Sequence, residues 1–86
     1  FNPSTTIKFT LPSLEDGGLA LPTTLKIYNV LGEVVRTLVD EPMASGVHHI
    51  IWDGRDEEGN QVASGIYFYR LRAGTFQDTK KMVMLK

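Results

Sequence analysis

The segment from Asp53 to Asn60 is dense in oxygen-bearing side chains: Asp53, Asp56, Glu57, Glu58 and Asn60. Carboxylate and amide oxygens on a loop with glycines could hold a hard cation such as Ca²⁺. The spacing does not match an EF-hand, in which alternate positions supply oxygens and glycine is sixth. The other interpretation is a hairpin-type loop, in which Asp53 and Asp56 accept backbone N–H bonds and Gly54 and Gly59 shape the turns. We expect this structural role, with a calcium site as the alternative.

The other residues that could do chemistry do not form a catalytic set. His48 and His49 are adjacent, so in a strand they point to opposite faces and cannot chelate one metal ion together. Ser45 and Ser64 each precede a glycine, which is typical of the start of a turn and not of a nucleophile. The chain has no cysteine, which excludes thiolate zinc sites and a cysteine nucleophile. We therefore predict no enzymatic activity, no metal and no cofactor.

Aromatic side chains offer a second possible chemistry, because exposed rings can stack on sugars. Tyr67, Phe68 and Tyr69 are consecutive, so in a strand the two tyrosines share one face. Such alternation is typical of a core strand, and we expect both tyrosines in the core with Phe68 on the opposite face. Trp52 is expected to be a core anchor, since a large aromatic ring beside a turn can close one end of a sandwich.

Size and charge limit the classes of function. The chain has 86 residues, of which 42% are hydrophobic and 22% charged, which is typical of one folded domain. The formal net charge is −1, so there is no general electrostatic attraction to nucleic acid or anionic membrane. Apolar runs are far shorter than the ~20 residues that span a bilayer. The start at Phe1 does not resemble a signal peptide, and since the chain does not begin with Met we expect a domain excised from a longer protein.

The elements that must position these residues are short strands. Glycines and prolines divide the chain into pieces rich in Val, Ile, Thr, Phe and Tyr, at the spacing typical of an all-β sandwich. The expected strands are Thr5–Leu11, Thr24–Val30, Glu33–Val39, Val47–Trp52, Ile66–Ala73 and Phe76–Leu85, with a short seventh at Gln61–Ala63. Loops are expected at Ser13–Leu21 and Asp40–Gly46. The prediction is an all-β, Ig-like antiparallel sandwich of about seven strands.

The alternation also predicts which side chains face the core. Buried positions recur at every second residue of a half-buried strand. The expected core consists of Ile7, Phe9, Leu25, Ile27, Trp52, Tyr67, Tyr69, Leu71, Met82 and Met84. Gly32, between two strands, is expected to supply a turn conformation with positive φ.

Four segments, in order and at natural spacing, resemble a family of domains at the C-terminus of secreted bacterial proteins. They are Phe1–Ile7, Leu25–Val35, Trp52–Leu71 and Lys80–Lys86. The third contains the family's Trp-Asp-Gly motif, and later Gly65 and Tyr67. Two related families share the pattern: the type IX secretion system C-terminal sorting domain and the Ig-like domain of the flagellar hook-capping protein. Both resemblances imply a β-sandwich without catalysis.

The sorting domain is the preferred interpretation, because the Lys80–Lys86 ending resembles the C-terminal signal of that family. It implies a domain that directs an upstream cargo on the same chain through the outer-membrane secretion machinery, to the cell surface or the extracellular space. The alternatives are a structural Ig-like spacer of the hook-capping type and a carbohydrate-binding accessory module.

The end of the chain carries a concentration of positive charge. Residues 70–86 contain five basic side chains and one acidic one, which gives the segment a formal charge of +4. Lysines on an edge strand protect it from unwanted pairing. The other interpretation is recognition, in which Lys80, Lys81 and Lys86 orient the last strand as it docks on the transport machinery.

Overall fold

The protein is described by a computed structural model that covers residues 4–12 and 20–85. The described residues form six strands and no helix: β1 (Thr5–Leu11), β2 (Leu21–Tyr28), β3 (Val34–Met43), β4 (Gly46–Trp52), β5 (Gly65–Ala73) and β6 (Phe76–Met84). The described part of the chain therefore contains no helix that could cross a membrane. The prediction of an all-β antiparallel fold is confirmed, with one strand fewer than expected.

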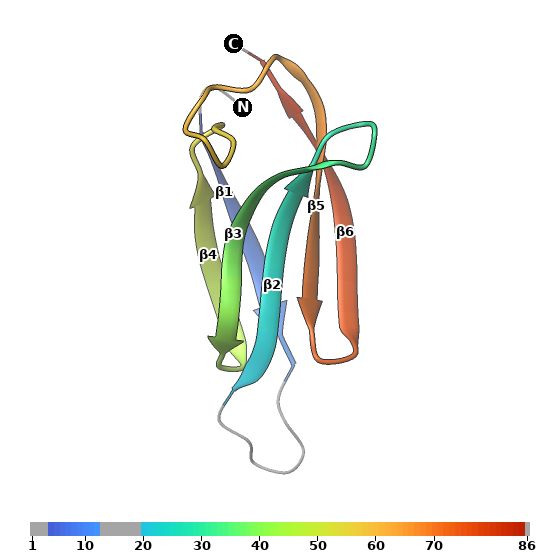
Figure 1. Cartoon of the computed structure of the whole chain (residues 1–86). Helices are drawn as coiled ribbons and strands as arrows, with labels where there is room; N and C mark the ends of the chain where they lie inside the picture. Colours follow the sequence, from blue (N-terminus) through green and yellow to red (C-terminus); the bar gives the residue numbers. More distant parts are fainter. Residues whose placement is uncertain (1–3, 13–19, 86) are drawn as a thin grey trace.

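Two antiparallel sheets pack face to face (Figure 1). One contains β1 and β4, and the other contains four strands in the order β3-β2-β5-β6. The register places Thr5 of β1 opposite Trp52 of β4, and Gly65 of β5 opposite Met84 of β6. Since hairpins connect β2 with β3 and β5 with β6, the larger sheet is built mainly from short-range connections.

The core lies between the sheets and is built mainly from alternate residues of β1, β2 and β5, with one buried residue each from β3, β4 and β6. It consists of Ile7, Phe9, Leu11, Leu25, Ile27, Val39, Trp52, Tyr67, Leu71, Ala73 and Met84. Eight of the expected core residues are fully buried, whereas Tyr69 and Met82 are only partly buried against the cluster. The expected core did not include Leu11, Val39 and Ala73: Leu11 and Ala73 continue the inward rows of β1 and β5 at the strand ends, and Val39 lies in the middle of β3.

Several element boundaries differ from the sequence prediction, among them those of β2, which runs over Leu21–Tyr28 instead of the expected Thr24–Val30. The loop expected at Asp40–Gly46 is wrong, because β3 continues to Met43 and only Ala44 and Ser45 form the turn. Pro42 does not end the strand because β3 is an edge strand of its sheet, where one side of the backbone has no ladder partner. The seventh strand expected at Gln61–Ala63 is also wrong, since only an isolated bridge joins Gln61 to Arg55.

The β2–β3 connection shows why Gly32 is needed. Asn29 Oδ1 accepts hydrogen bonds from the N–H groups of Leu31 and Glu33, each at 3.0 Å, and Gly32 N donates to Asn29 O. Gly32 has a φ of 80°, in the left-handed region that residues with a Cβ rarely adopt. Of the expected loop at Ser13–Leu21, residues 13–19 lie outside the described residues, and Leu21 begins β2.

Candidate functional site

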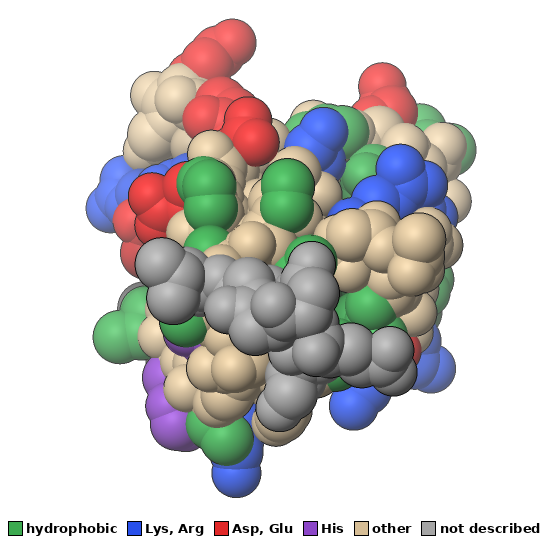
Figure 2. Space-filling view, turned by 90° about the horizontal axis from the view of Figure 1, so that it is seen from below, with side chains coloured by type: hydrophobic (Ala, Val, Ile, Leu, Met, Phe, Trp, Pro, Cys, Tyr) green, Lys and Arg blue, Asp and Glu red, His purple; other side chains and the backbone are tan. Residues whose placement is uncertain are grey.

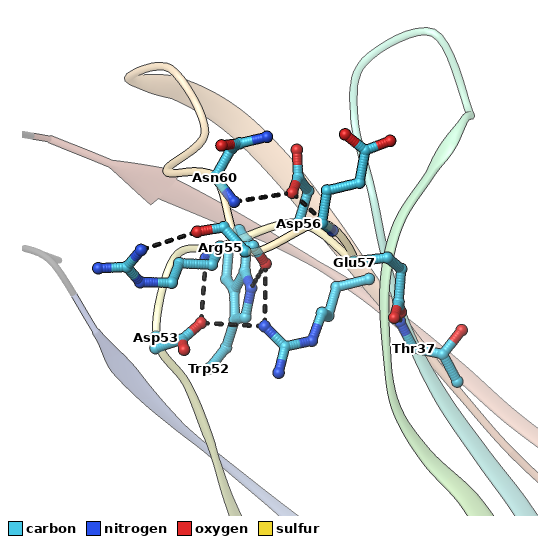
Figure 3. A network of polar contacts seen from close by, with 10 residues as sticks. Thr37, Trp52, Asp53, Arg55, Asp56, Glu57 and Asn60 are labelled. Atoms are coloured by element: carbon cyan, nitrogen blue, oxygen red, sulfur yellow. Dashed lines mark hydrogen bonds and ion pairs between the residues drawn. The ribbon is translucent and has the colours of Figure 1, made fainter.

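The sharpest cluster of polar side chains is the loop from Trp52 to Asn60, which we call the end loop because it closes one end of the sandwich (Figure 3). Trp52 is 0% exposed, and its indole Nε1 donates a hydrogen bond to Arg55 O at 3.0 Å. Its ring meets Tyr67 of β5 edge to face, with the centroids 5.5 Å apart. Trp52 therefore joins the end loop, the β4 end and β5 into one packed unit.

Asp53 holds the first turn of the end loop. Its Oδ1 accepts the backbone N–H of Arg55 at 3.1 Å and forms a salt bridge with Arg36 Nη1 of β3 at 3.2 Å. The Arg36 guanidinium also donates to Arg55 O at 3.3 Å. Because both partners of the ion pair are partly exposed, its contribution lies in fixing the loop against β3 more than in Coulomb energy.

Asp56 holds the second turn. Its Oδ1 accepts the backbone N–H groups of Glu58 at 2.9 Å and Asn60 at 3.0 Å. Across the same turn, Arg55 Nη1 donates to Gly59 O at 2.7 Å, and Gly59 has a φ of 84°. Both expected carboxylates therefore accept backbone N–H bonds, which is the geometry of an Asx-stabilised loop.

Glu57 has a role that the sequence did not reveal. Its backbone N–H donates to Val35 O at 3.2 Å, and its Oε1 accepts the N–H of Thr37. Val35 and Thr37 lie on β3, so Glu57 completes hydrogen bonds along a stretch of a free sheet edge. From the sequence, an acidic residue in a turn is expected to be solvated. No local pattern connects position 57 with a strand twenty residues earlier.

This arrangement favours a structural role over metal chemistry. The Asp53 and Asp56 oxygens nearest the loop are engaged by backbone N–H groups or by arginine, and the described residues contain no group of three or more His, Asp or Glu side chains placed to hold a metal ion. A hollow of ≈ 390 Å³ beside the end loop is lined in part by Glu33, Asp56, Glu57, Glu58 and Tyr67. The carboxylates make this hollow acidic, and the hollow is open to solvent.

The remaining candidates for chemistry are dispersed. His48 lies on the inner side of β4, stacked on Phe9 with the ring centroids 5.4 Å apart, whereas His49 is exposed. Tyr67 is buried and Tyr69 and Phe68 are half-buried on opposite faces of β5. The Tyr67 hydroxyl donates to Ala63 O at 2.7 Å, and burial raises the pKa of this phenol above 10.0. Trp52 and Tyr67 are thus packed in the core and not presented to a sugar.

Of the three proposed recognition lysines, the two that the structure describes, Lys80 and Lys81, lie on opposite faces of β6. Lys80 lies opposite Tyr69 on the inner face of β6, whereas Lys81 lies opposite Phe68 on the outer face. Lys86 lies outside the described residues. The outer face of the larger sheet instead brings together four cations from three strands: Lys26, Arg70, Arg72 and Lys81. The sequence did not indicate that Lys26 belongs to this set. Lys26 joins Arg70 only through the β2–β5 register, which is a long-range pairing.

Within this outer face, Arg70 is the best-fixed cation. Its guanidinium lies 5.1 Å from the centre of the Tyr28 ring, and its Nε donates to Thr79 Oγ1 at 3.4 Å. A cation over an aromatic ring is attracted by the ring's negative face.

At one end of the molecule, which Figure 2 shows, hydrophobic side chains form separate small groups among charged ones.

Comparison with known proteins gives two findings. Residues 4–76 match the sequence profile of the FlgD Ig-like domain. The crystal structure of FlgD from P. aeruginosa has a similar fold, with a TM-score of 0.67 and 21% sequence identity, over 93% of this chain and 57% of that one. A search among curated protein sequences returned no significant match. These matches support the relation to the hook-capping Ig-like domain, whereas the relation to the sorting domain rests on the sequence motifs.

Proposed function

This chain belongs to the FlgD Ig-like domain family, and from this we propose that it is a non-catalytic structural domain of the hook-capping type. The observation that carries the proposal is the match over residues 4–76, which includes the end loop. The chain corresponds to 57% of the length of the FlgD chain. The proposal therefore concerns the Ig-like unit as a building block and not the activity of the whole FlgD protein.

The contacts of the end loop support this role. Trp52, Asp53, Asp56 and Glu57 direct their hydrogen bonds into the loop backbone or onto β3. Side chains engaged in this way stiffen the end of the sandwich instead of facing a substrate. A sandwich 44 Å long and 21 Å across, closed by such a loop, can hold whatever is attached to it at a fixed spacing.

A domain exchange tests the proposal. We would replace the Ig-like domain of P. aeruginosa FlgD with residues 1–86 and measure hook length and swimming. A structural unit is expected to restore part of the hook assembly, and the same exchange with Trp52→Ala is the matched control, since it removes the anchor of the end loop. Proteins that accumulate and fold but leave assembly at the level of a deletion would contradict the proposal.

A second candidate function is sorting through the type IX secretion system. Its support is the sequence resemblance, which extends over Lys80–Lys86, beyond the last residue of the FlgD-type match. On this proposal the partner is the outer-membrane secretion machinery, a cargo precedes the domain on the same chain, and the product is secreted or displayed on the cell surface.

Export of a fluorescent protein fused in front of residues 1–86 separates the two functions, in a bacterium that has this secretion system. Sorting predicts fluorescence outside the cell, whereas a spacer leaves it inside. Lys80→Glu and Lys81→Glu change opposite faces of β6, so a loss of export in one variant alone would identify the docking face. Lys80→Glu combined with Lys86→Glu tests the terminal charge, and normal export of this folded double variant would exclude guidance by these two lysines.

A further inference from the structure

The two sheets differ in size, so the smaller one, as far as the structure describes the chain, does not extend over the whole inner face of the larger one. β1 and β4 form a two-stranded sheet facing a four-stranded one. In Figure 1 β1 passes behind β3 and β2 and β4 lies to the left of β3, and no described strand lies behind the lower parts of β5 and β6. Since sandwiches bury the inner faces of both sheets against each other, Leu71 and Ala73 of β5 are covered, whereas the inner face of β6 at Phe76 is only partly covered by the described residues.

A hollow of ≈ 210 Å³, which we call the β1 groove, marks this place. It is lined by Lys8, Phe9, Thr10, Tyr69, Leu71, Phe76, Asp78 and Lys80. The first three are consecutive on β1, so the groove runs along the backbone edge of that strand and not only along one face. Within the described residues, β1 pairs with β4 alone, and no β4 residue lines the groove. The edge of β1 that borders the groove is therefore the one that pairs with no described strand.

The opposite wall of the groove carries apolar side chains that are not fully covered. Phe76 is 39% exposed and Tyr69 is partly buried, whereas Leu71, deeper between the sheets, is 2% exposed. All three lie on the inner face of the larger sheet. An unpaired strand edge beside partly exposed aromatic rings has the features of a β-augmentation site.

We propose that the β1 groove binds one extended strand of a partner protein, which pairs with β1 and extends the smaller sheet over β5. Alternate side chains of that strand face Tyr69 and Phe76, so they are apolar. The groove carries two cations, Lys8 and Lys80, against one carboxylate, Asp78, and no ion pair joins these side chains to a described residue. An acidic residue at the outward position beside Lys8 complements this charge, because directly opposed side chains of paired strands interact.

A second copy of this chain does not fit the groove. If two β1 edges paired antiparallel about a two-fold axis, both four-stranded sheets would lie on the same side of the joined sheet. β5 and β6 of each copy would then occupy the place of the other copy's larger sheet. A single strand from a different protein avoids this overlap.

The test is a titration followed by ¹⁵N–¹H NMR with a blocked heptapeptide, Thr-Val-Thr-Val-Glu-Val-Thr. We expect saturable shifts at Lys8 to Thr10, Tyr69 and Phe76, and slower exchange of β1 amides. A peptide with lysine in place of glutamate should bind roughly threefold more weakly, and one with proline at the central valine should not bind, because proline cannot complete the ladder.

Two variants of similar type serve as site and control. Phe76→Thr removes the exposed ring of the groove and should weaken binding roughly tenfold, whereas Ile51→Thr removes an exposed side chain on the outer face of β4 and should leave it unchanged. Thermal unfolding of both variants checks that they are folded. No saturable shift at millimolar peptide, shifts along the free edge of β3 or β6 instead, or equal effects of the two variants would overturn the proposal.

Discussion

Replacing Trp52 tests whether the end loop depends on one buried ring. The side chain is 0% exposed, packs edge to face on Tyr67 and donates to Arg55 O. Truncating a buried tryptophan to alanine costs about 3–5 kcal/mol, a total that includes about 0.5–1.5 kcal/mol for the aromatic pair and about 1 kcal/mol for the hydrogen bond. A small domain has a total stability of about 5–10 kcal/mol, so Trp52→Ala should remove much of it.

The measurement is urea unfolding followed by far-ultraviolet circular dichroism, since the substitution removes the single tryptophan of the chain. With a slope of about 1–1.5 kcal/mol per molar urea for a small domain, the midpoint should fall by about 2–5 M. Trp52→Phe keeps a ring against Tyr67 but loses the N–H donor, and should cost about 1–2 kcal/mol.

The neighbouring Ile51 provides the control, because it is 67% exposed on the same strand. Ile51→Ala should change the free energy of unfolding by no more than about 0.5 kcal/mol. If Trp52→Ala lowers stability by less than about 1 kcal/mol, or no more than Ile51→Ala does, the ring is not the anchor of this end and the reasoning is refuted.

The remaining predictions concern the end loop, the buried phenol and the β2–β3 turn. Glu57→Ala should destabilise the domain by about 1 kcal/mol, measured by urea unfolding, because it leaves the N–H of Thr37 without its acceptor; Glu58→Ala, one residue away, should stay within about 0.5 kcal/mol, and equal effects would contradict the β3 contact. Burial raises the pKa of Tyr67, so above pH 10.0 the unfolded state loses a proton that the folded state keeps. The contribution of this phenol to the free energy of unfolding is therefore present below that pH and is lost as the pH rises further. Unfolding of Tyr67→Phe between pH 8 and pH 11 should show a shallower alkaline decline than the wild type, and parallel curves would reject this. Gly32→Ala should lower the stability by about 1 kcal/mol, because φ is positive at this position. Gly32→Asn should lower it less, since asparagine tolerates that conformation, and thermal unfolding of the two variants should show this order.

Much of the fold could be predicted from the chain because its signals are local. Ile7, Phe9 and Leu11 alternate with polar residues, and β1 was predicted with the bounds that the structure has. The same period identified the inward rows of β2 and β5, including Leu25, Ile27, Tyr67 and Leu71.

The loop chemistry of Asp53 and Asp56 could also be predicted. In these Asx turns the carboxylate accepts a hydrogen bond from the N–H group two residues further along the chain, and Asp56 also accepts one from the N–H group four residues further. Such contacts form within a few residues whatever surrounds them, so residue type and the nearby glycines were enough.

Other features depended on contacts between distant parts of the chain. Pro42 marked a loop in the sequence but lies in β3, because its position at a sheet edge removes the penalty for a missing N–H. Glu57 resembled a solvated acid, and Lys26 had no visible relation to Arg70, until the sheets placed each beside its partner.

The division into two and four strands, and with it the unpaired edge of β1 beside Tyr69 and Phe76, was equally hidden. Alternation along a strand is set by the geometry of one backbone and so can be read from neighbouring residues. Which strand lies beside which depends on burying the whole apolar surface at once, and that balance exists only when the complete chain has folded.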